Sequence, residues 1–494
     1  MYHGLIFSYR KERIERGNGA HRIATFLRSY DWDVEVIDFC SEWTQEELQE
    51  LVKSRVGPNT KFFGFSSFIS YWTSSANKFT AWLKKTYPGI ATMIGGQGCL
   101  LTPAENIDYW IDSFGEYAVL ELLKYITGNT IIDGRFQLED SNGKKIIKAL
   151  RDFPAWNMPS YRVNYQKRDF IESYEMLTIE TSRGCRFKCD FCNFPILGVK
   201  DDVSRTANDF KEELLFNYNE YGVKNYTIAD ETFNDRREKI IKYAEAVNDL
   251  DFDPWFMAFM RGDLLVNQRD LWGDMLSLGL GGHFYGIETF NHNAGKIIGK
   301  GMQPDKLKQG LIDARNYFEP HNIYRGTISL ICGLPKETPE TFADGINWCK
   351  SNWKGQSVTS WYLEVPEYNS PMTNLSAFSK NLEKYGLRRR KMIKKSKKVS
   401  DHVLTTYFPS LESMSIWEHD GMDQLQAIEI LDNFYETVYP KYFITTGFSA
   451  PTGLVQYQTN DIKEIIRLEK YNDKSPFINN HVSEYKRKKL DWKP

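Results

Sequence analysis

The chain of 494 residues has few cysteines, no long apolar run and almost no net charge, and each absence excludes a class of protein. The seven cysteines are odd in number and clustered, unlike a disulfide framework, so a reducing, cytoplasmic setting is expected. The longest candidate membrane stretch, "GTISLICGLP", is about half the length needed to cross a bilayer. The start, "MYHGLIFSYRKER", meets charge after a short apolar run, so no signal peptide is expected. A net charge of −2 argues against a nucleic-acid-binding surface over the whole molecule.

Residues 1–150 alternate short apolar runs with amphipathic stretches, which predicts a doubly wound, Rossmann-like α/β domain with a parallel sheet. The expected strands are 3–8, 34–39, 61–69, 91–96 and 107–116, and the expected helices are 21–30, 44–56 and 75–87. Thr44 and Glu47 predict a capping box at the start of the second helix. Ligands of such sheets bind at the carboxyl ends of the strands. The sequence places there Ser66, Ser67, Gly95, Gly96, Gly98, Gly115 and Glu116.

Two further regions follow a linker at residues 151–175. In residues 176–370, six apolar runs separated by helical stretches predict a (β/α)6 partial barrel, whose site is expected at the carboxyl ends of its strands. The expected strands are 175–181, 225–233, 254–261, 282–290, 324–333 and 357–365. Residues 371–494 read as a mostly helical region that shapes the substrate pocket, with 423–443 its clearest helix.

One run in this last region, "RRRKMIKKSKK" at 388–398, has eight basic residues in eleven. It is interpreted either as a solvated helix face or as a site for an anionic substrate or a phosphate backbone. The run leaves nucleic-acid binding open, although the charge of the whole chain does not favour it.

Three of the cysteines, Cys185, Cys189 and Cys192, lie within "TSRGCRFKCDFCNF", directly after the first predicted barrel strand. Their spacing is C-x3-C-x2-C. A structural zinc site would need a second tight pair of ligands, and the other four cysteines are isolated. Three thiolates leave one iron of a 4Fe–4S cubane without a protein ligand, so that this iron can bind a substrate or cofactor.

With this motif at this place, the chain resembles the radical S-adenosylmethionine (SAM) superfamily over residues ~176–365. The resemblance implies that Cys185, Cys189 and Cys192 bind a 4Fe–4S cluster whose fourth iron is chelated by S-adenosylmethionine. The segments "IADETF", "FMRGDLL", "YGIET" and "GTISLICGLPKET" are similar to the family's later strand ends. The expected cosubstrate-binding residues are Phe191, Asp230, Glu231, Arg261, Glu288 and Thr289.

The resemblance also implies the chemistry. A reduced cluster donates one electron to the sulfonium, which cleaves to methionine and a 5′-deoxyadenosyl radical that abstracts hydrogen from an unactivated C–H bond. The protein contributes orientation and exclusion of water. An external electron donor such as flavodoxin or ferredoxin is expected, with a small-molecule or peptide substrate and no membrane partner. No general acid or base is identified from the sequence.

The N-terminal domain resembles the cobalamin-binding domains that precede the barrel in one branch of this superfamily. The shared features are the strand ends "GFSS" and "IGGQG" and the segment "FGEYAVLELL". The D-x-H-x-x-G pattern of other cobalamin proteins is absent. His21 and Cys99 are candidate lower-face ligands, with ordinary packing as the alternative. Cobalamin is expected at Ser66, Ser67, Gly95, Gly96, Gly98 and Glu116.

Three functions remain open from the sequence. The first is a cobalamin-dependent radical methyltransferase acting on an unactivated carbon. The second is a cobalamin-independent radical enzyme that performs rearrangement, epimerisation or oxidation, for which Cys332 is a candidate hydrogen donor, or else a buried small apolar residue. The third is an iron–sulfur electron-transfer or structural protein, which would need a fourth cluster ligand.

Overall fold

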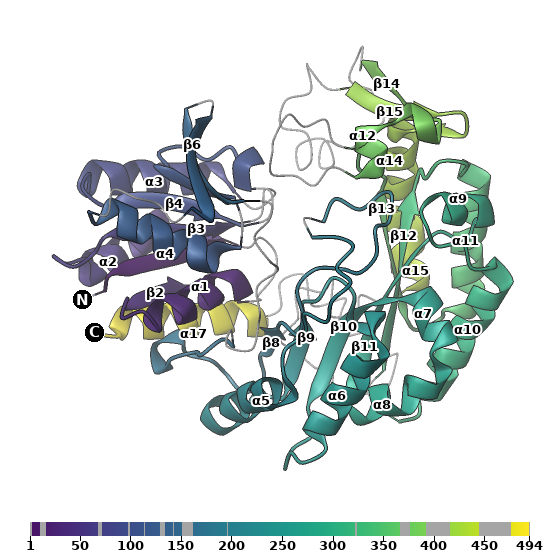
Figure 1. Cartoon of the computed structure of the whole chain (residues 1–494), viewed down its shortest axis with the longest axis horizontal. Helices are drawn as coiled ribbons and strands as arrows, with labels where there is room; N and C mark the ends of the chain where they lie inside the picture. The colour runs from purple at the N-terminus through teal and green to yellow at the C-terminus, as the bar shows by residue number, and fades with distance from the viewer. Residues whose placement is uncertain are drawn as a thin grey trace.

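The computed structural model describes residues 2–9, 16–67, 72–96, 99–112, 114–128, 134–141, 143–150, 162–194, 196–321, 324–365, 376–391, 415–443 and 476–493. Figure 1 shows an N-terminal body, a larger central body built on a second sheet, and a small third sheet near the end of the chain. Both large sheets are α/β arrangements, as predicted.

In its described residues, the N-terminal body holds a seven-stranded sheet in the order β2-β1-β3-β4-β5-β7-β6, parallel except for β6 against β7. Its strands are β1 (Gly4–Tyr9), β2 (Val34–Ile37), β3 (Phe62–Ser67), β4 (Ala91–Gly95), β5 (Tyr109–Asp112), β6 (Phe136–Ser141) and β7 (Lys144–Ala149). Its helices are α1 (Asn18–Arg28), α2 (Gln45–Arg55), α3 (Ser74–Thr86) and α4 (Gly115–Ile126). The sequence did not predict the β6–β7 hairpin.

Helices cover both faces of this sheet, because its central strands are apolar on both sides. Helices α1 and α4 pack together on one face, and α2 and α3 on the other. The predicted capping box is confirmed: the Thr44 hydroxyl accepts from the Glu47 amide at 3.2 Å, and the Glu47 carboxylate accepts from the Thr44 amide at 2.8 Å. The winding direction changes between β1 and β3, which is where such sheets bind ligands at their carboxyl ends.

The central sheet is wholly parallel in its described residues, in the order β13-β12-β11-β10-β9-β8. Its strands are β8 (Met176–Ile179), β9 (Asn225–Ile228), β10 (Trp255–Arg261), β11 (Leu280–Glu288), β12 (Arg325–Cys332) and β13 (Ser357–Tyr362). Its helices are α5 (Ala207–Tyr221), α6 (Arg237–Val247), α7 (Gly262–Asn267), α8 (Trp272–Ser277), α9 (His292–Ile297), α10 (Pro304–Phe318) and α11 (Pro339–Asn352). All six predicted strands are present, and β8 and β13 stay apart as edges, so the barrel is partial.

Strand alternation gives this sheet two different faces. On β12, Ile328 and Leu330 point into the apolar core, whereas the alternating residues Thr327 and Ser329 point to the opposite face. The helices therefore pack against the apolar outer face of the sheet, and the inner face carries polar side chains toward the barrel interior.

The third region contributes a three-stranded antiparallel sheet and short helices. Its described elements are β14 (Arg388–Lys391), β15 (Ser415–His419), β16 (Met422–Asp423), α12 (Ala377–Lys380), α14 (Gln424–Asn433), α15 (Tyr439–Tyr442) and α17 (Pro476–Asp491). The start of the basic run is therefore a strand, which corrects the expected helix face. Arg388 and Arg390 pair with Glu418 at 2.7 and 2.9 Å across the sheet; residues 392–398 lie outside the described part.

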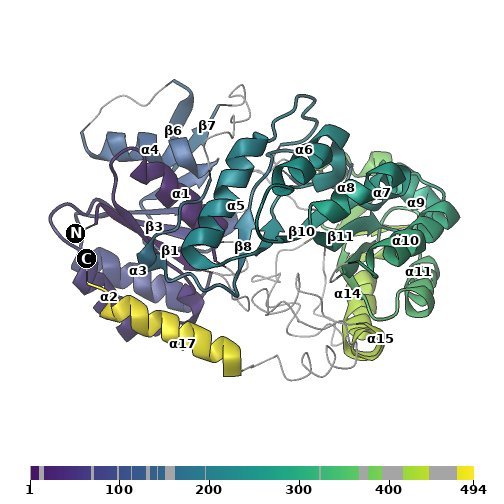
Figure 2. The same ribbon diagram turned by 90° about the horizontal axis from the view of Figure 1, so that it is seen from below.

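The last helix returns to the N-terminal body, as Figures 1 and 2 both show. Val482 and Tyr485 of α17 join the apolar core beside α2 and α3, and the Tyr485 hydroxyl accepts from the Asp38 amide at 2.9 Å. Lys489 is fully buried and lies 2.9 Å from a Glu35 carboxylate oxygen. Residues from both ends of the chain therefore build one core.

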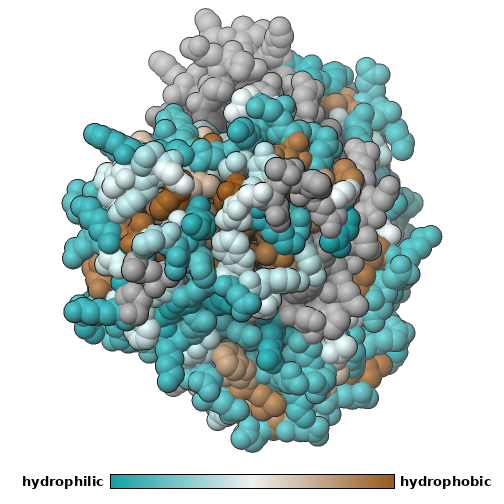
Figure 3. Space-filling model, turned by 60° about the vertical axis from the view of Figure 1, so that its left-hand side comes forward, coloured by the Kyte–Doolittle hydropathy of each residue, from teal (hydrophilic) through white to brown (hydrophobic). Residues whose placement is uncertain are grey.

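The face that Figure 3 shows is mostly hydrophilic where it is described, with apolar residues in small separate patches. Within the described ranges, none of the helices is long and apolar enough to cross a membrane.

Candidate functional site

The three motif cysteines lie on a loop that follows β8, here called the cysteine loop (residues 181–194 and 196–199). The Cys185 amide donates to the Ile196 carbonyl at 2.9 Å, and its own carbonyl accepts from the Gly198 amide at 2.6 Å. Gly184 has φ +83°, and a Cβ there would lie 2.7 Å from the Ile196 side chain. Glycine is required before the first cysteine because both the backbone conformation and the space exclude a side chain.

All three cysteines are free thiols; Cys185 is buried, and Cys189 and Cys192 are half-buried. Within the described residues, no three His, Cys, Asp or Glu side chains converge on a single ion. A cubane does not require that convergence, because each thiolate binds a different iron. The predicted cluster role of these cysteines therefore stays a prediction.

Burial raises the pKa of two of these thiols. The pKa of Cys192 rises to about 11. The pKa of Cys189 is also raised by burial, while Lys300 and Arg261 oppose that effect. Without metal these two thiols are protonated at neutral pH. Binding iron would release those protons, so metal loading of this loop would depend on pH.

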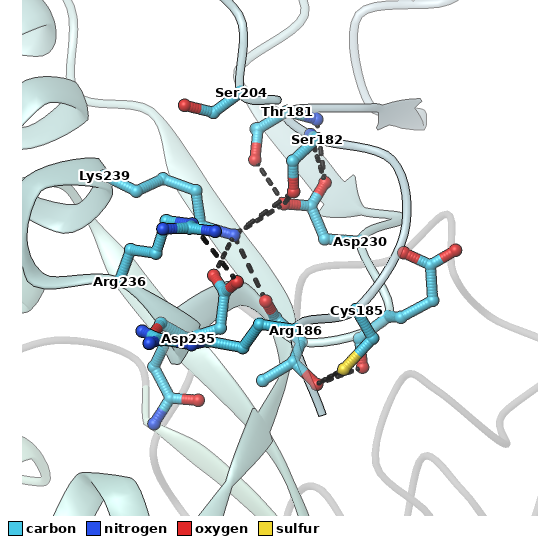
Figure 4. A network of polar contacts seen from close by, with 12 residues as sticks. Thr181, Ser182, Cys185, Arg186, Ser204, Asp230, Asp235, Arg236 and Lys239 are labelled. Carbon is cyan, nitrogen blue, oxygen red and sulfur yellow. Dashed lines mark hydrogen bonds and ion pairs between the residues drawn. The ribbon is translucent and has the colours of Figure 1, made fainter. Parts of the chain in front are cut away.

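A buried lysine, Lys239 of α6, connects the start of the cysteine loop to β9 and the residues after it (Figure 4). Its ammonium lies 3.2 Å from Asp230, 2.7 Å from Asp235 and 3.2 Å from the Ser182 hydroxyl, and it donates to the Thr232 carbonyl at 3.1 Å. Burial opposes the charge, but the two carboxylates outweigh it and raise the pKa of Lys239. The sequence did not single out this residue; a lysine on the buried face of a helix was the available signal.

Asp230, predicted to contact the cosubstrate, lies inside this network. Its carboxylate accepts from the Thr181 and Ser182 amides at 2.8 and 3.0 Å and from the two hydroxyls at 2.5 and 2.7 Å. With Lys239 also in contact, both oxygens hold the segment that leads into Cys185. The structure thus places Asp230 as a support of the loop, and a contact with cosubstrate stays a prediction.

Glu231, the next residue, has a buried carboxylate oxygen, Oε2, without a partner among the described residues. Burial raises the pKa of Glu231 to about 7. The following residue, Thr232, places its hydroxyl 3.5 Å from the Cys185 sulfur. Glu231 therefore directly precedes a residue that contacts the first cysteine, and its buried acceptor without a described partner fits a ligand with N–H donors.

Arg261, at the end of β10, contacts the second cysteine directly. Its Nη1 donates to the Cys189 sulfur at 3.2 Å, while Nε and Nη2 form a fork on Asp263 at 3.0 and 2.7 Å. The guanidinium also lies 4.2 Å from the centre of the Phe187 ring. The sequence predicted this arginine at the site but paired it with a cosubstrate carboxylate.

Glu288 and Thr289, at the end of β11, each pair with a residue of a neighbouring loop. Glu288 has φ +67°, an uncommon conformation for a side-chain-bearing residue, and its carboxylate accepts from Lys300 at 2.7 Å. The Thr289 hydroxyl donates to Glu337 at 2.8 Å. Burial raises the pKa of Glu337 to about 7. The sequence did not single out Lys300 or Glu337. Lys300 lies in a loop outside any motif, whereas Glu337 lies within the quoted segment "GTISLICGLPKET", which was the available signal.

Phe191 and Cys332 take ordinary packing positions. Phe191 is half-buried against the barrel core. Cys332 is fully buried, with its sulfur 3.9 Å from the Met422 sulfur of the third region. A hydrogen-donor role for Cys332 stays a prediction.

The described cobalamin candidates lie at the carboxyl edge of the N-terminal sheet, as predicted, but their local structural roles differ. Ser66 pairs in register with Ser8 of β1, at the change of winding direction, and is half-buried. Gly95 makes room for Ile111, since a Cβ would lie 3.3 Å from that side chain. Gly96 has φ +121°, which suits glycine alone. The Ser67 side chain and Gly98 lie outside the described part.

Glu116, expected at cobalamin, is buried between the two bodies and pairs with the cysteine loop. Its carboxylate accepts from Arg183 at 2.5 Å, and Arg22 of α1 lies 3.6 Å away. Burial alone would raise its pKa, but Arg183 and Arg22 lower it to about 2. Arg183 also lies over the Phe114 ring at 4.3 Å and directly precedes Gly184. The pair therefore joins the N-terminal sheet to the motif.

The two candidate lower-face ligands are buried and engaged. His21 hydrogen-bonds Asp38 at 2.9 Å, and the Cys99 thiol donates to the Ile111 carbonyl at 3.3 Å. Both contacts match the ordinary packing that the sequence left as the alternative.

The third region also holds the cysteine loop. The Phe378 amide donates to the Asp190 carbonyl at 3.1 Å, and the Ser376 amide donates to the Asn193 side chain at 2.9 Å. The loop between β8 and α5 is thus fixed by residues from every region of the chain.

Residues 179–349 match the Radical SAM superfamily, so this part of the chain is a radical SAM domain, and the chain is an enzyme. The matched segment includes the cysteine loop and β9 to β12.

Similarity also extends beyond this domain. An uncharacterized methyltransferase of Pyrococcus horikoshii is 23% identical over 67% of this chain and 72% of its own length. The solved TsrM of Kitasatospora setae, a radical S-adenosylmethionine methyltransferase with tryptophan substrate and a SAM analog bound, has TM-score 0.59 and 12% identity over 79% of each chain. OxsB, a cobalamin-dependent S-adenosylmethionine radical enzyme, has TM-score 0.55 and 14% identity over 78% of this chain and 56% of its own. At these identities the solved structures establish a shared fold.

Proposed function

We propose that the chain is a cobalamin-dependent radical SAM enzyme that transfers a methyl group to an unactivated carbon of a small-molecule or peptide substrate. The observation that carries the proposal is the cysteine loop: three free thiols in C-x3-C-x2-C spacing at the carboxyl end of the first barrel strand, inside a matched radical SAM domain. A second feature that fits a bound ligand is Glu231 Oε2, which has no partner among the described residues and directly precedes Thr232, whose hydroxyl lies 3.5 Å from the Cys185 sulfur.

When bound, the 4Fe–4S cluster supplies the electron that cleaves S-adenosylmethionine, and cobalamin supplies the methyl group. Cys185, Cys189 and Cys192 would hold the cluster. Glu231 offers an acceptor for the amino group of the cosubstrate, and Phe191, Glu288 and Thr289 remain its proposed neighbours. Asp230 and Lys239 position the start of the loop, because they contact its first residues and the residues that follow β9.

Cobalamin is proposed at the carboxyl edge of the N-terminal sheet, near Ser66. Support comes from the change of winding direction between β1 and β3, which is where such sheets bind ligands. TsrM has been solved with cobalamin and a [4Fe–4S] cluster, and shares this fold over 80% of the present chain. Glu116 is not proposed as a cobalamin contact, because Arg183 and Arg22 lie against its carboxylate.

The test is anaerobic purification of the full chain with cobalamin supplied, followed by iron and cobalt analysis and a 5′-deoxyadenosine assay with a strong reductant. About four irons and one cobalt per chain are expected, with slow release of 5′-deoxyadenosine. Ser66→Tyr should fill the sheet edge and remove cobalt while leaving iron unchanged. Ser54→Tyr, at an exposed position of α2 in the same domain, should leave both metals in place.

Iron without cobalt in the wild type would overturn the methyltransferase and favour a cobalamin-independent radical enzyme. A full cluster whose spectrum does not respond to S-adenosylmethionine would instead favour an electron-transfer protein.

A further inference from the structure

Three different contacts fix the position of the Arg261 guanidinium, and in this position it also contacts the sulfur of Cys189. Asp263 forms a two-bonded fork with its guanidinium, the Phe187 ring lies 4.2 Å from it, and the Gly299 carbonyl accepts from Nη2 at 3.4 Å. The remaining nitrogen, Nη1, donates to the Cys189 sulfur at 3.2 Å. A planar guanidinium fixed at two nitrogens has little freedom to move its third away from the sulfur.

We propose that Arg261 sets the reduction potential of the cluster by donating a hydrogen bond to the Cys189 thiolate, an inference that rests on the cluster proposed above. Hydrogen bonds to ligand sulfurs are among the factors that set iron–sulfur potentials. The reduced cluster carries one more negative charge than the oxidised one. A cationic N–H donor at the sulfur therefore stabilises the reduced form more and raises the potential.

This role differs from the pairing with a cosubstrate carboxylate that the sequence predicted for the same residue. A carboxylate partner would affect cosubstrate binding and leave the potential of the cosubstrate-free cluster unchanged. A donor to Cys189 would affect that potential directly. The two roles can be separated because the cluster potential is measured without cosubstrate, whereas a carboxylate pairing affects only the binding of cosubstrate.

The experiment is a redox titration of the reconstituted full chain, without cosubstrate, followed by electron paramagnetic resonance. Arg261→Met removes the donor while keeping an unbranched side chain. The reduction equilibrium should shift about tenfold against the reduced cluster, equal to about 59 mV for one electron. Arg186→Met is the matched control: Arg186 lies in the cysteine loop next to Cys185 and donates to the Asp235 carbonyl at 3.0 Å. It removes one positive charge beside another cluster cysteine without removing a donor to Cys189, and its shift should stay below about twofold.

Iron content separates the possible failures. A wild type without a cubane would overturn the proposed function itself. A cubane in both proteins with an unchanged potential in Arg261→Met would overturn the role of Arg261, as would equal shifts in Arg261→Met and Arg186→Met. If Arg261→Met does not retain iron, Arg261→Gln decides. Glutamine removes the cation and cannot form the Asp263 fork, so the potential of this variant must also fall, and an unchanged value refutes the proposal.

Discussion

The two parallel sheets of this chain both end in small and polar residues, yet those residues have different surroundings. At the carboxyl edge of the barrel sheet, Asp230, Arg261 and Glu288 each contact a neighbouring charged or sulfur-bearing side chain. At the edge of the N-terminal sheet, Ser66 is half-buried and Gly96 is exposed. The barrel edge is therefore fixed by contacts among its own side chains, whereas at the N-terminal edge Ser66 is partly exposed and Gly96 is exposed among the described residues.

This difference shows how unlike the two predicted sites are in physical terms. Strand-end residues of the barrel contact the loop that carries the three thiols or its neighbours, so contacts within the protein explain their positions without a ligand. Strand-end glycines of the N-terminal sheet are explained locally, Gly95 by Ile111 and Gly96 by its positive φ. Glycine at a sheet edge thus indicates a ligand only when packing and backbone conformation do not already require it.

The largest effect should come from removing the barrel cysteines. Cys185→Ala, Cys189→Ala or Cys192→Ala should each abolish a stable cubane in anaerobic iron analysis, since each thiolate holds a separate iron. Cys99→Ala at the N-terminal edge should leave iron unchanged, because that thiol is bonded to the Ile111 carbonyl. Full iron retention in a variant with all three cysteines replaced by alanine would show that the iron is bound elsewhere.

The second effect concerns stability behind the barrel edge. Lys239→Met leaves Asp230 and Asp235 buried without their cation, which should cost about 3–5 kcal/mol and lower the unfolding temperature of the metal-free chain. Lys242→Met, one turn further along α6 and partly exposed, should cost about 1 kcal/mol or less. Similar losses in both variants would show that Lys239 has no special position in the network.

The smallest effect should appear at the contact between the two bodies. The pKa of Glu116 is about 2, below its ordinary value of 4.5, so its contribution is present above pH 4.5 and is lost as the pH falls toward 2. Glu116→Gln should lower stability at neutral pH by about 3 kcal/mol and converge with the wild type near pH 2.

The measurement is the unfolding temperature followed by circular dichroism between pH 7 and pH 2. Glu121→Gln is the control, because Glu121 lies on the same helix and pairs within it with Lys124 at 2.6 Å. A wild-type advantage over Glu116→Gln that persists at pH 2 would contradict the assigned ion pair.

Much of the fold followed from local pattern. The six barrel strands, the first five strands of the N-terminal sheet and the Thr44 capping box depend on neighbouring residues, so periodicity and short motifs were enough to predict them. The β6–β7 hairpin was not predicted. Arg388–Lys391 forms a strand, although the basic run was interpreted as a helix face. A run of like charges has neither a helical nor a strand period, so its local pattern could not distinguish the two.

The sequence by itself determined the cysteine loop, its place after the first barrel strand and the order of the polar strand ends. The tertiary structure decided which partner each of these residues meets. Arg183 pairs with Glu116 across 67 positions, and Lys489 of the last helix meets Glu35 of β2. Such pairs join segments that are distant in sequence, and their energies depend on burial and on the geometry of two side chains. Local periodicity carries neither quantity, so these contacts exist only in the folded chain.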